Sequence, residues 1–325
     1  MPEGHSIHRI ARQFDRHFVG KEIAASSPQG RFAEGATVLD GHTMVSARAI
    51  GKQMFLEFDS QLWLRVHLGL YGAWDFAGDF TADATVVSAG ERTGQTGQRG
   101  RLRELDATDG YSPRIGAPRQ RRLRMSEQDV LSDMPTIFPH EPVGAVRVRL
   151  LTRDTVADLR GPTACEVQTP EQVDASMAKL GPDPLVDDQS VGEERFVSVI
   201  RKKPTSIALL LMDQSVVSGI GNVYRAELLF RARLDPHTPG KLVSEEALRA
   251  LWQDWCRLLV IGVKTGQMLT RDRLTPASAR NSFTRRADRY WVYHRDGLPC
   301  RICGTNILLE ELGGRKLYWC PIDQG

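Results

Sequence analysis

Apolar residues near the start of the chain recur at the spacing of an amphipathic helix. The positions that stand three or four residues apart are Ile7, Ile10, Phe14 and Phe18. Such spacing puts the four side chains on one face of a helix, and Gly20 supplies a stop signal. The pattern therefore predicts a first helix that packs its apolar face against a core.

A period of two replaces the helical period from about residue 35 to residue 74. Apolar and polar residues alternate from Met54 to Phe58 and from Leu62 to Leu68, as in half-buried strands. The alternation returns over 146–151, and this block closes at 158–162. These runs predict an antiparallel β-sandwich.

Residues 78–143 lie between the two strand blocks and show no sustained period. The segment is rich in Gly, Arg, Gln, Ser, Thr and Asp and has few aromatic residues. Such a composition buries too little apolar surface to offset chain entropy, so we predict a mostly disordered insertion. It is locally basic at Arg119, Arg121, Arg122 and Arg124. These arginines either add nonspecific contacts to phosphate or belong to a solvated loop.

Helical patterns dominate from residue 180 to about residue 266. Several helices with short connections are predicted, including Ile207 to Met212, Tyr224 to Arg233, and Glu245 to Val263. With 325 residues, the chain is long enough for two or three domains. The alternating and helical patterns thus occupy separate blocks, which favours a multidomain α+β protein.

Composition adds little about partners. The chain has 43 basic and 40 acidic residues and a net charge of +3, which alone is weak evidence for binding to nucleic acid. It contains no apolar run of membrane-spanning length and no signal-peptide pattern. We therefore expect a cytoplasmic location and no membrane partner.

The opening residues Met1-Pro2-Glu3-Gly4 carry candidate chemistry. Removal of Met1 leaves a secondary amine at Pro2 beside the carboxyl of Glu3. A free α-amino group has a pKa of about 7.7–8.0, so a usable fraction is neutral near pH 7. A neutral amine can attack a sugar C1′ and form a Schiff base. The alternative is an ordinary chain start whose helix only packs on the surface.

A glycine-rich turn joins two predicted helices at Gly219-Ile220-Gly221-Asn222. Glycines permit close approach of the backbone, and asparagine is a favoured N-cap. We predict that Asn222 caps the second helix and that the amides around it bind phosphate. An ordinary turn between helices remains the alternative.

Three of the five cysteines cluster near the end of the chain, which indicates a metal site in a reducing compartment. Cys300 and Cys303 have zinc-knuckle spacing, and Cys320 follows. A four-cysteine ribbon would place its last ligand at position 323, where the chain has Asp323. We predict a zinc site of three cysteines and one aspartate, which is weaker than a site of four cysteines. The alternatives are a hairpin without metal and an altered C-terminal sequence.

Taken together, the opening MPEG, the run GIGNVYRAELLF over 219–230 and the terminal cysteine cluster resemble the Fpg/Nei family of DNA glycosylases, with most similarity to endonuclease VIII proteins of the actinobacterial type. The resemblance implies an N-terminal helix plus antiparallel β-sandwich, a helix-two-turn-helix domain and a zinc-ribbon hairpin. We assign these to residues 1–180 with the insertion at 78–143, to 188–270, and to 285–325.

The resemblance also implies roles for individual residues. Pro2 would be the nucleophile and Glu3 the general acid/base, while Lys52 would contact phosphate near the lesion and assist the chemistry. The implied DNA-binding residues are Leu70, Tyr71, Asn222 and Arg315. Leu70 and Tyr71 would fill the gap left by an extruded base, and the alternative is that both pack inside. Asn222 and Arg315 would hold the DNA backbone.

The implied activity is that of a bifunctional DNA glycosylase/AP lyase, a monomer that acts on damaged double-stranded DNA. It would remove oxidised bases, with preference for pyrimidines, and cut the strand by β,δ-elimination. Two departures from the family pattern are His5-Ser6, where relatives often have Pro-Glu, and Gly69, where relatives can carry a polar side chain. Ser6 and Asp323 are the best support for the main alternative, a noncatalytic protein that binds damaged DNA. Retention of Pro2, Glu3 and Lys52 argues against that alternative. An RNA-binding zinc-ribbon protein explains the cysteines but not the N-terminus.

Overall fold

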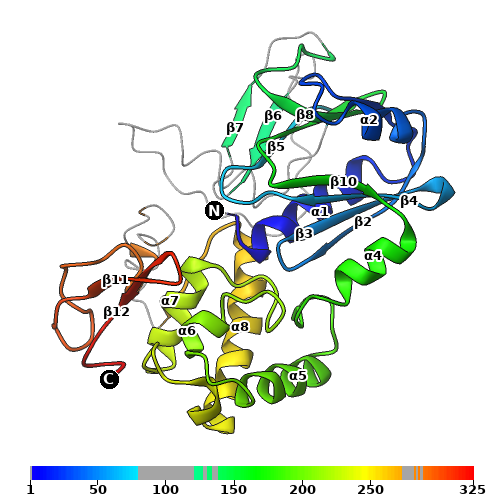
Figure 1. Cartoon of the computed structure of the whole chain (residues 1–325). Helices are drawn as coiled ribbons and strands as arrows, with labels where there is room; N and C mark the ends of the chain where they lie inside the picture. Colours follow the sequence, from blue (N-terminus) through cyan, green and yellow to red (C-terminus); the bar gives the residue numbers. More distant parts are fainter. Residues whose placement is uncertain are drawn as a thin grey trace, which may run out of the picture.

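The structure is a computed structural model that describes residues 2–79, 121–126, 130–133, 138–272, 282, 285 and 288–325. Figure 1 shows a β-sandwich with helix α1 at its base, a group of helices beside it, and a two-stranded hairpin at the C-terminus. The N-terminus lies between the sandwich and the helices (Figure 1). The predicted α+β fold class is confirmed.

The sandwich consists of two antiparallel sheets. The six-stranded sheet has the order β1-β8-β9-β5-β6-β7, and the four-stranded sheet has the order β10-β4-β3-β2. The strands of the first sheet are β1 (Ala24–Ser26), β5 (Ala73–Gly78), β6 (Arg121–Met125), β7 (Val130–Asp133), β8 (Val146–Leu151) and β9 (Thr155–Arg160). Those of the second are β2 (Met44–Ile50), β3 (Gln53–Phe58), β4 (Leu62–His67) and β10 (Ala164–Gln168). The short helices α2 (Ala33–Leu39) and α4 (Pro170–Met177) and the 3-10 turn η1 (Asp59–Gln61) complete this part.

Helix α1 (Gly4–His17) packs its apolar face into the sandwich core, as its sequence pattern predicts. Phe14 is fully buried, and its ring lies 4.7 Å from the ring of Trp74 and 5.1 Å from that of Phe76. Packing of this kind fixes the helix axis relative to the sheet. The start of α1, where Pro2 and Glu3 lie, is therefore held by the core.

Two short strands form inside the segment 78–143, which was predicted as a mostly disordered insertion. Strand β6 pairs with β5, and β7 pairs with β6, so both extend the six-stranded sheet. The reason is that β5 offers a free edge, and main-chain hydrogen bonds to an existing strand need no apolar periodicity. Arg124 on β6 is exposed, whereas Arg119 lies outside the described residues.

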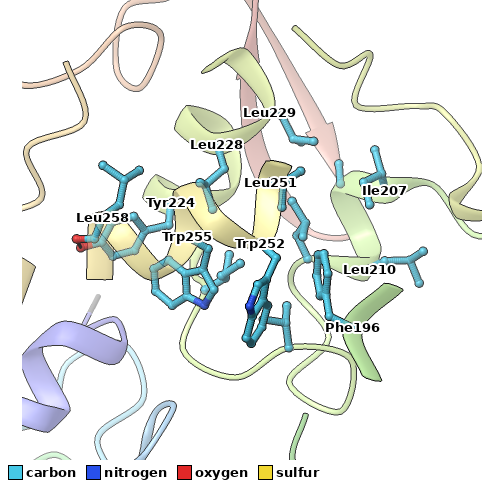
Figure 2. Close-up of a cluster of buried hydrophobic side chains, with 14 of the residues drawn as sticks. Phe196, Ile207, Leu210, Tyr224, Leu228, Leu229, Leu251, Trp252, Trp255 and Leu258 are labelled. Carbon is cyan, nitrogen blue, oxygen red and sulfur yellow. Dashed lines mark hydrogen bonds between the residues drawn. The ribbon is translucent and has the colours of Figure 1, made fainter. Parts of the chain in front are cut away.

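The helical part contains α5 (Gln189–Arg201), α6 (Ile207–Leu210), α7 (Asn222–Arg231) and α8 (Glu245–Thr265), with the 3-10 turn η2 (Gly240–Leu242). Figure 2 shows its apolar core, in which Trp252 and Trp255 of α8 face the other helices. The ring of Trp255 lies 4.8 Å from that of Tyr224 on α7. Ser244 caps the start of α8 and Gly266 ends it in the left-handed conformation. This core fixes α7, whose first residues border the site described below.

The C-terminal hairpin pairs β11 (Leu308–Leu312) with β12 (Arg315–Trp319). Gly313 and Gly314 both have positive φ, as a two-residue type I′ turn requires, and Arg315 follows at the tip. Ala226 and Phe230 of α7 share a small apolar cluster with Tyr318. The hairpin is thereby packed against α7.

Across the described part of the chain, none of the helices is both long enough and apolar enough to cross a membrane.

Candidate active site

Three glycine turns meet where the sandwich contacts the helices. The amide of Gly4 donates a hydrogen bond of 2.9 Å to the carbonyl of Gly219, and a Cβ on Gly4 would lie only 2.9 Å from the Gly219 Cα. Gly51 has φ +56°, and a Cβ there would lie 2.7 Å from the Ser218 Cβ. The structure thus brings together the N-terminal segment, the turn before Lys52 and the turn before α7.

The carboxylate of Glu3 lies at the N-terminus of α7. It accepts hydrogen bonds from the amides of Gly221 at 2.8 Å, Val223 at 2.8 Å and Tyr224 at 3.3 Å. Such amides are free of partners inside the helix, and the helix dipole favours an anion at this end. A residue some 220 positions away in the sequence therefore supplies the cap of α7.

This arrangement corrects two predictions about Asn222. The N-cap of α7 is Gly221, and Asn222 is the first helical residue. The amides of the turn are occupied by Glu3, so they are not a free phosphate site. Sequence reasoning missed this because the capping group comes from a distant segment, whereas cap rules consider neighbouring residues.

The side chain of Glu3 is almost fully buried. Burial raises the pKa of its carboxyl, while the charge of Lys52 and the three amide hydrogen bonds act in the opposite direction. A raised pKa lets the carboxyl hold a proton closer to neutral pH. Pro2, the residue before it, is also buried.

Lys52 lies in the tight turn between β2 and β3 and is only 9% exposed. Its Nζ donates a hydrogen bond of 2.7 Å to the carbonyl of Ile220. Burial lowers the pKa of Lys52 to about 8, the charges of Arg315 and Arg225 act in the same direction, and Glu3 opposes them. The lysine therefore lies next to both Glu3 and the turn before α7.

Asn222 connects α7 to the hairpin. Its Nδ2 donates a hydrogen bond of 2.8 Å to the carbonyl of Lys316, next to Arg315 at the tip. Arg225 donates to the same carbonyl at 3.1 Å and also to Oδ1 of Asn222. Asn222 and Arg315, both predicted DNA contacts, consequently lie close together beside Lys52.

Arg225 is a site residue that sequence reasoning missed. Its side chain is fully buried, and burial lowers the pKa of its guanidinium to about 10. The available signal was its position three residues after Asn222, which puts both side chains on one face of α7. Lys52, Arg225 and Arg315 make the region around the Glu3 carboxylate electropositive.

Leu70 and Tyr71 lie in the loop between β4 and β5 and point to solvent. Their exposed fractions are 43% and 85%, so the alternative that they pack inside is wrong. Gly69 before them has φ +67°. An exposed apolar pair on a tight loop is suited to insertion between DNA bases. His67, at the start of this loop, has a pKa lowered by burial and by the charges of Lys52 and Arg65.

The residues that replace the family's Pro-Glu pair are both buried. Nε2 of His5 lies 3.2 Å from Oγ of Ser6. Burial lowers the pKa of His5 to about 3, and nearby positive charges add to the effect, so the imidazole is neutral. The ring of His5 packs edge-on against Tyr224. Neither residue supplies the negative charge of the missing carboxylate.

The four predicted metal ligands converge at the base of the hairpin. The ligand atoms of Cys300, Cys303, Cys320 and Asp323 all lie within 4.8 Å of one another. Three soft thiolates and one carboxylate suit a tetrahedral zinc ion. The thiol of Cys300 donates a hydrogen bond of 3.0 Å to Asp323 Oδ2, so the carboxylate lies directly against the cysteine cluster. The residues present therefore fit a structural metal.

Two family models match the parts of the chain that form this site. The formamidopyrimidine-DNA glycosylase N-terminal domain matches residues 1–109, and the formamidopyrimidine-DNA glycosylase H2TH domain matches residues 180–273. The chain is 36% identical over 328 residues to Endonuclease 8 1 of Mycobacterium tuberculosis, with all of both chains covered. It is 33% identical over 153 residues to the formamidopyrimidine-DNA glycosylase of Rippkaea orientalis, which covers 47% of this chain and 52% of the relative.

Solved structures share the fold. The Lactococcus lactis formamidopyrimidine-DNA glycosylase, bound to DNA with an AP site, has a TM-score of 0.67 at 18% identity and 99% coverage of both chains. The same protein in complex with a THF-DNA and an inhibitor has a TM-score of 0.70 at 19% identity and full coverage of both chains. The full-length sequence similarity to Endonuclease 8 1 and the shared fold agree with the family resemblance of MPEG, GIGNVYRAELLF and the cysteine cluster. The chain therefore belongs to the Fpg/Nei family of DNA repair glycosylases.

Proposed function

We propose that this protein is a bifunctional DNA glycosylase and AP lyase that uses the Pro2 amine as its nucleophile after removal of Met1. The observation that carries the proposal is the binding of the Glu3 carboxylate by three amides of α7, beside Lys52. Because Glu3 is fixed, the preceding Pro2 has a defined position at the junction of sandwich and helices. A surface-packing role for the N-terminus needs no such arrangement.

The proposed reaction begins with a damaged nucleotide turned out of the DNA stack. The Pro2 nitrogen attacks C1′, the bond from C1′ to the base breaks, and the base leaves with a proton. Glu3 acts as general acid/base on the sugar: it gives a proton to O4′ as the C1′–O4′ bond breaks, which opens the ring and leaves a Schiff base between C1′ and the Pro2 nitrogen. Its raised pKa supports this role. The Schiff base makes the C2′ proton acidic, so β- and then δ-elimination release the phosphates on both sides of the sugar.

The positive side chains around Glu3 suit the DNA backbone. Lys52, Asn222 and Arg315 come from the sandwich, α7 and the hairpin, and we propose that they hold phosphates next to the lesion. The metal site lies at the base of the same hairpin. A zinc ion on Cys300, Cys303, Cys320 and Asp323 would stabilise the hairpin and would take no part in the chemistry.

For the substrate, we propose oxidised bases, pyrimidines in particular, and abasic sites in double-stranded DNA. The motif resemblance to endonuclease VIII proteins favours oxidised pyrimidines over 8-oxoguanine. Exposed Leu70 and Tyr71 would occupy the space of the extruded base. We further propose that the protein acts as a monomer on DNA in the bacterial cytosol.

Borohydride trapping on DNA with an abasic site tests the proposal. We expect a covalent adduct with the mature protein and none with protein that retains Met1, in which Pro2 has no free amine. Pro2→Gly keeps a free α-amine without the proline ring, so it should trap more slowly than the wild type. Pro28→Gly, a change at an exposed proline, is the matched control and should trap normally. Tight binding to damaged DNA with no adduct and no strand cleavage would refute the enzyme. That result would favour a noncatalytic damage-binding protein, which Ser6 makes the second candidate.

A further inference from the structure

Asp183 is a fully buried carboxylate in the segment that connects α4 to α5. Its Oδ1 accepts a hydrogen bond of 2.9 Å from the amide of Leu185. Its Oδ2 accepts one of 2.6 Å from the amide of Gly51 and lies 2.8 Å from Nε2 of His8. An ionised carboxylate has no proton to give, so the His8 Nε2–H is the donor.

These partners belong to the two segments that carry the proposed chemistry. His8 lies on α1, which begins two residues after Pro2, and Gly51 immediately precedes Lys52. One carboxylate therefore links the helix behind the nucleophile to the turn that presents the lysine. The two segments come from different parts of the sandwich.

The segment around Asp183 is also bound to the turn before α7. The amide of Gly181 donates to the carbonyl of Gln214 at 2.7 Å, and the Gln214 Nε2 donates to the carbonyl of Ile220 at 3.1 Å. That carbonyl is also the acceptor for Lys52 Nζ. Asp183 and the acceptor of Lys52 thus belong to one connected hydrogen-bond network.

The chemistry of Asp183 favours a positioning role over a contribution to stability. A buried carboxylate is costly unless it is hydrogen-bonded, and here both oxygens are. Compared with apolar packing, such a buried charge adds little net stability, and its best-attested use is to select one arrangement of packed elements. The arrangement selected here is the one that brings Pro2 and Lys52 to the same place.

We propose that Asp183, together with His8, is a positioning residue for the covalent step, which holds α1 and the Lys52 turn in the reactive geometry. The inference rests on the proposed function, in which Pro2 attacks the sugar and Lys52 holds the adjacent phosphate. Asp183 itself acts through Gly51 and His8 and does not touch the DNA sugar.

The test compares Asp183→Asn with the wild-type protein by borohydride trapping at saturating abasic-site DNA. An asparagine amide keeps the shape but turns an N–H toward at least one of the three donors. We expect adduct formation to slow about 10- to 100-fold, as small misplacements of reacting groups do. DNA affinity should change by no more than a few-fold. The matched control is Asp187→Asn, which loses only the hydrogen bond of 2.7 Å from the Asp183 amide and should trap at the wild-type rate.

A pair of variants at His8 keeps the inference testable if Asp183→Asn folds poorly. His8→Gln retains an N–H donor and should keep most of the trapping rate, whereas His8→Leu should be slow. The rate constant is measured on the folded, DNA-binding fraction, so a loss of folded protein alone lowers the amplitude and not the rate.

Two results would overturn the inference. One is a wild-type rate constant in Asp183→Asn with a reduced amplitude only, which indicates a purely structural residue. The other is equal trapping rates for His8→Gln and His8→Leu. Absence of any adduct with the wild-type protein would instead refute the proposed function, and this inference with it.

Discussion

Replacement of Lys52 by methionine should stabilise the protein while it abolishes strand cleavage. Methionine has a similar length and a flexible apolar chain, so it can occupy the same buried space without a charge. The wild-type lysine is 9% exposed, and burial is the main cause that lowers its pKa. The charge is therefore held at a cost in folding free energy.

The magnitude follows from the pKa. A fall from 10.5 to about 8 corresponds to roughly 3 kcal/mol of unfavourable free energy for the charged form in the folded state. The variant also loses the hydrogen bond to the Ile220 carbonyl, which offsets about 1 kcal/mol of this gain. We expect Lys52→Met to raise the free energy of unfolding by about 2 kcal/mol near neutral pH.

The gain should depend on pH in a defined direction. Below pH 8, Lys52 is protonated in both the folded and the unfolded protein, so the difference between wild type and variant is constant. Between pH 8 and 10.5, the unfolded wild type binds more protons than the folded wild type, so wild-type stability rises relative to the variant. The advantage of Lys52→Met should disappear across this range.

Urea unfolding of both proteins at a series of pH values measures this difference. Lys52→Arg is the control, since arginine stays charged throughout the range and its stability curve should show no relative rise there. Parallel stability curves for wild type and Lys52→Met would refute the burial argument. Cleavage of abasic-site DNA should decline above about pH 8 in the wild type, because the lysine loses the charge that holds phosphate, and should not decline in active Lys52→Arg.

Three further predictions concern other parts of the site. Glu3→Gln turns an amide N–H toward the amides of α7, so it should lower the free energy of unfolding by about 1–3 kcal/mol in urea titrations. The same variant should slow base excision at least ~100-fold in single-turnover assays. Unchanged stability would contradict the capping role of Glu3. The side chain of Tyr71 is 85% exposed, so Tyr71→Ala should leave the melting temperature unchanged. The variant should slow excision from a lesion-containing duplex about 10-fold or more, with less effect on single-stranded abasic DNA. Equal effects on the two substrates would argue against a wedge role. Asp323→Cys should slow the loss of zinc to a chelator, because thiolate is a softer zinc ligand than carboxylate; a colorimetric zinc indicator measures the rate of loss. A metal content near zero in folded, active wild-type protein would contradict the zinc site.

Several features of the fold could be predicted from local patterns. The helical period of Ile7, Ile10 and Phe14 predicted a buried face of α1, and the strand alternation predicted the sandwich. The spacing of the terminal cysteines predicted the cluster with Asp323. These predictions succeeded because each depends on residues that are close in the sequence.

Strands β6 and β7 show where local patterns fail. Their segment lacks the apolar alternation of an independent strand, yet the edge of β5 offers hydrogen-bond partners to it. Main-chain pairing with an existing edge depends on the neighbouring strand and not on the segment's own composition. The sequence period therefore could not predict these strands.

By itself, the sequence determined the helix behind Pro2, the glycine turn before α7, the metal-ligand spacing and the family motifs. Only the tertiary structure decided how these parts act on one another. Glu3 caps α7, Arg225 binds Asn222 and the hairpin, and Asp183 links α1 to the Lys52 turn. Each of these contacts except that of Arg225 with Asn222 joins residues from distant parts of the chain. Long-range contacts of this kind form only when the two cores pack against each other, so no local rule of spacing, capping or periodicity can reveal them.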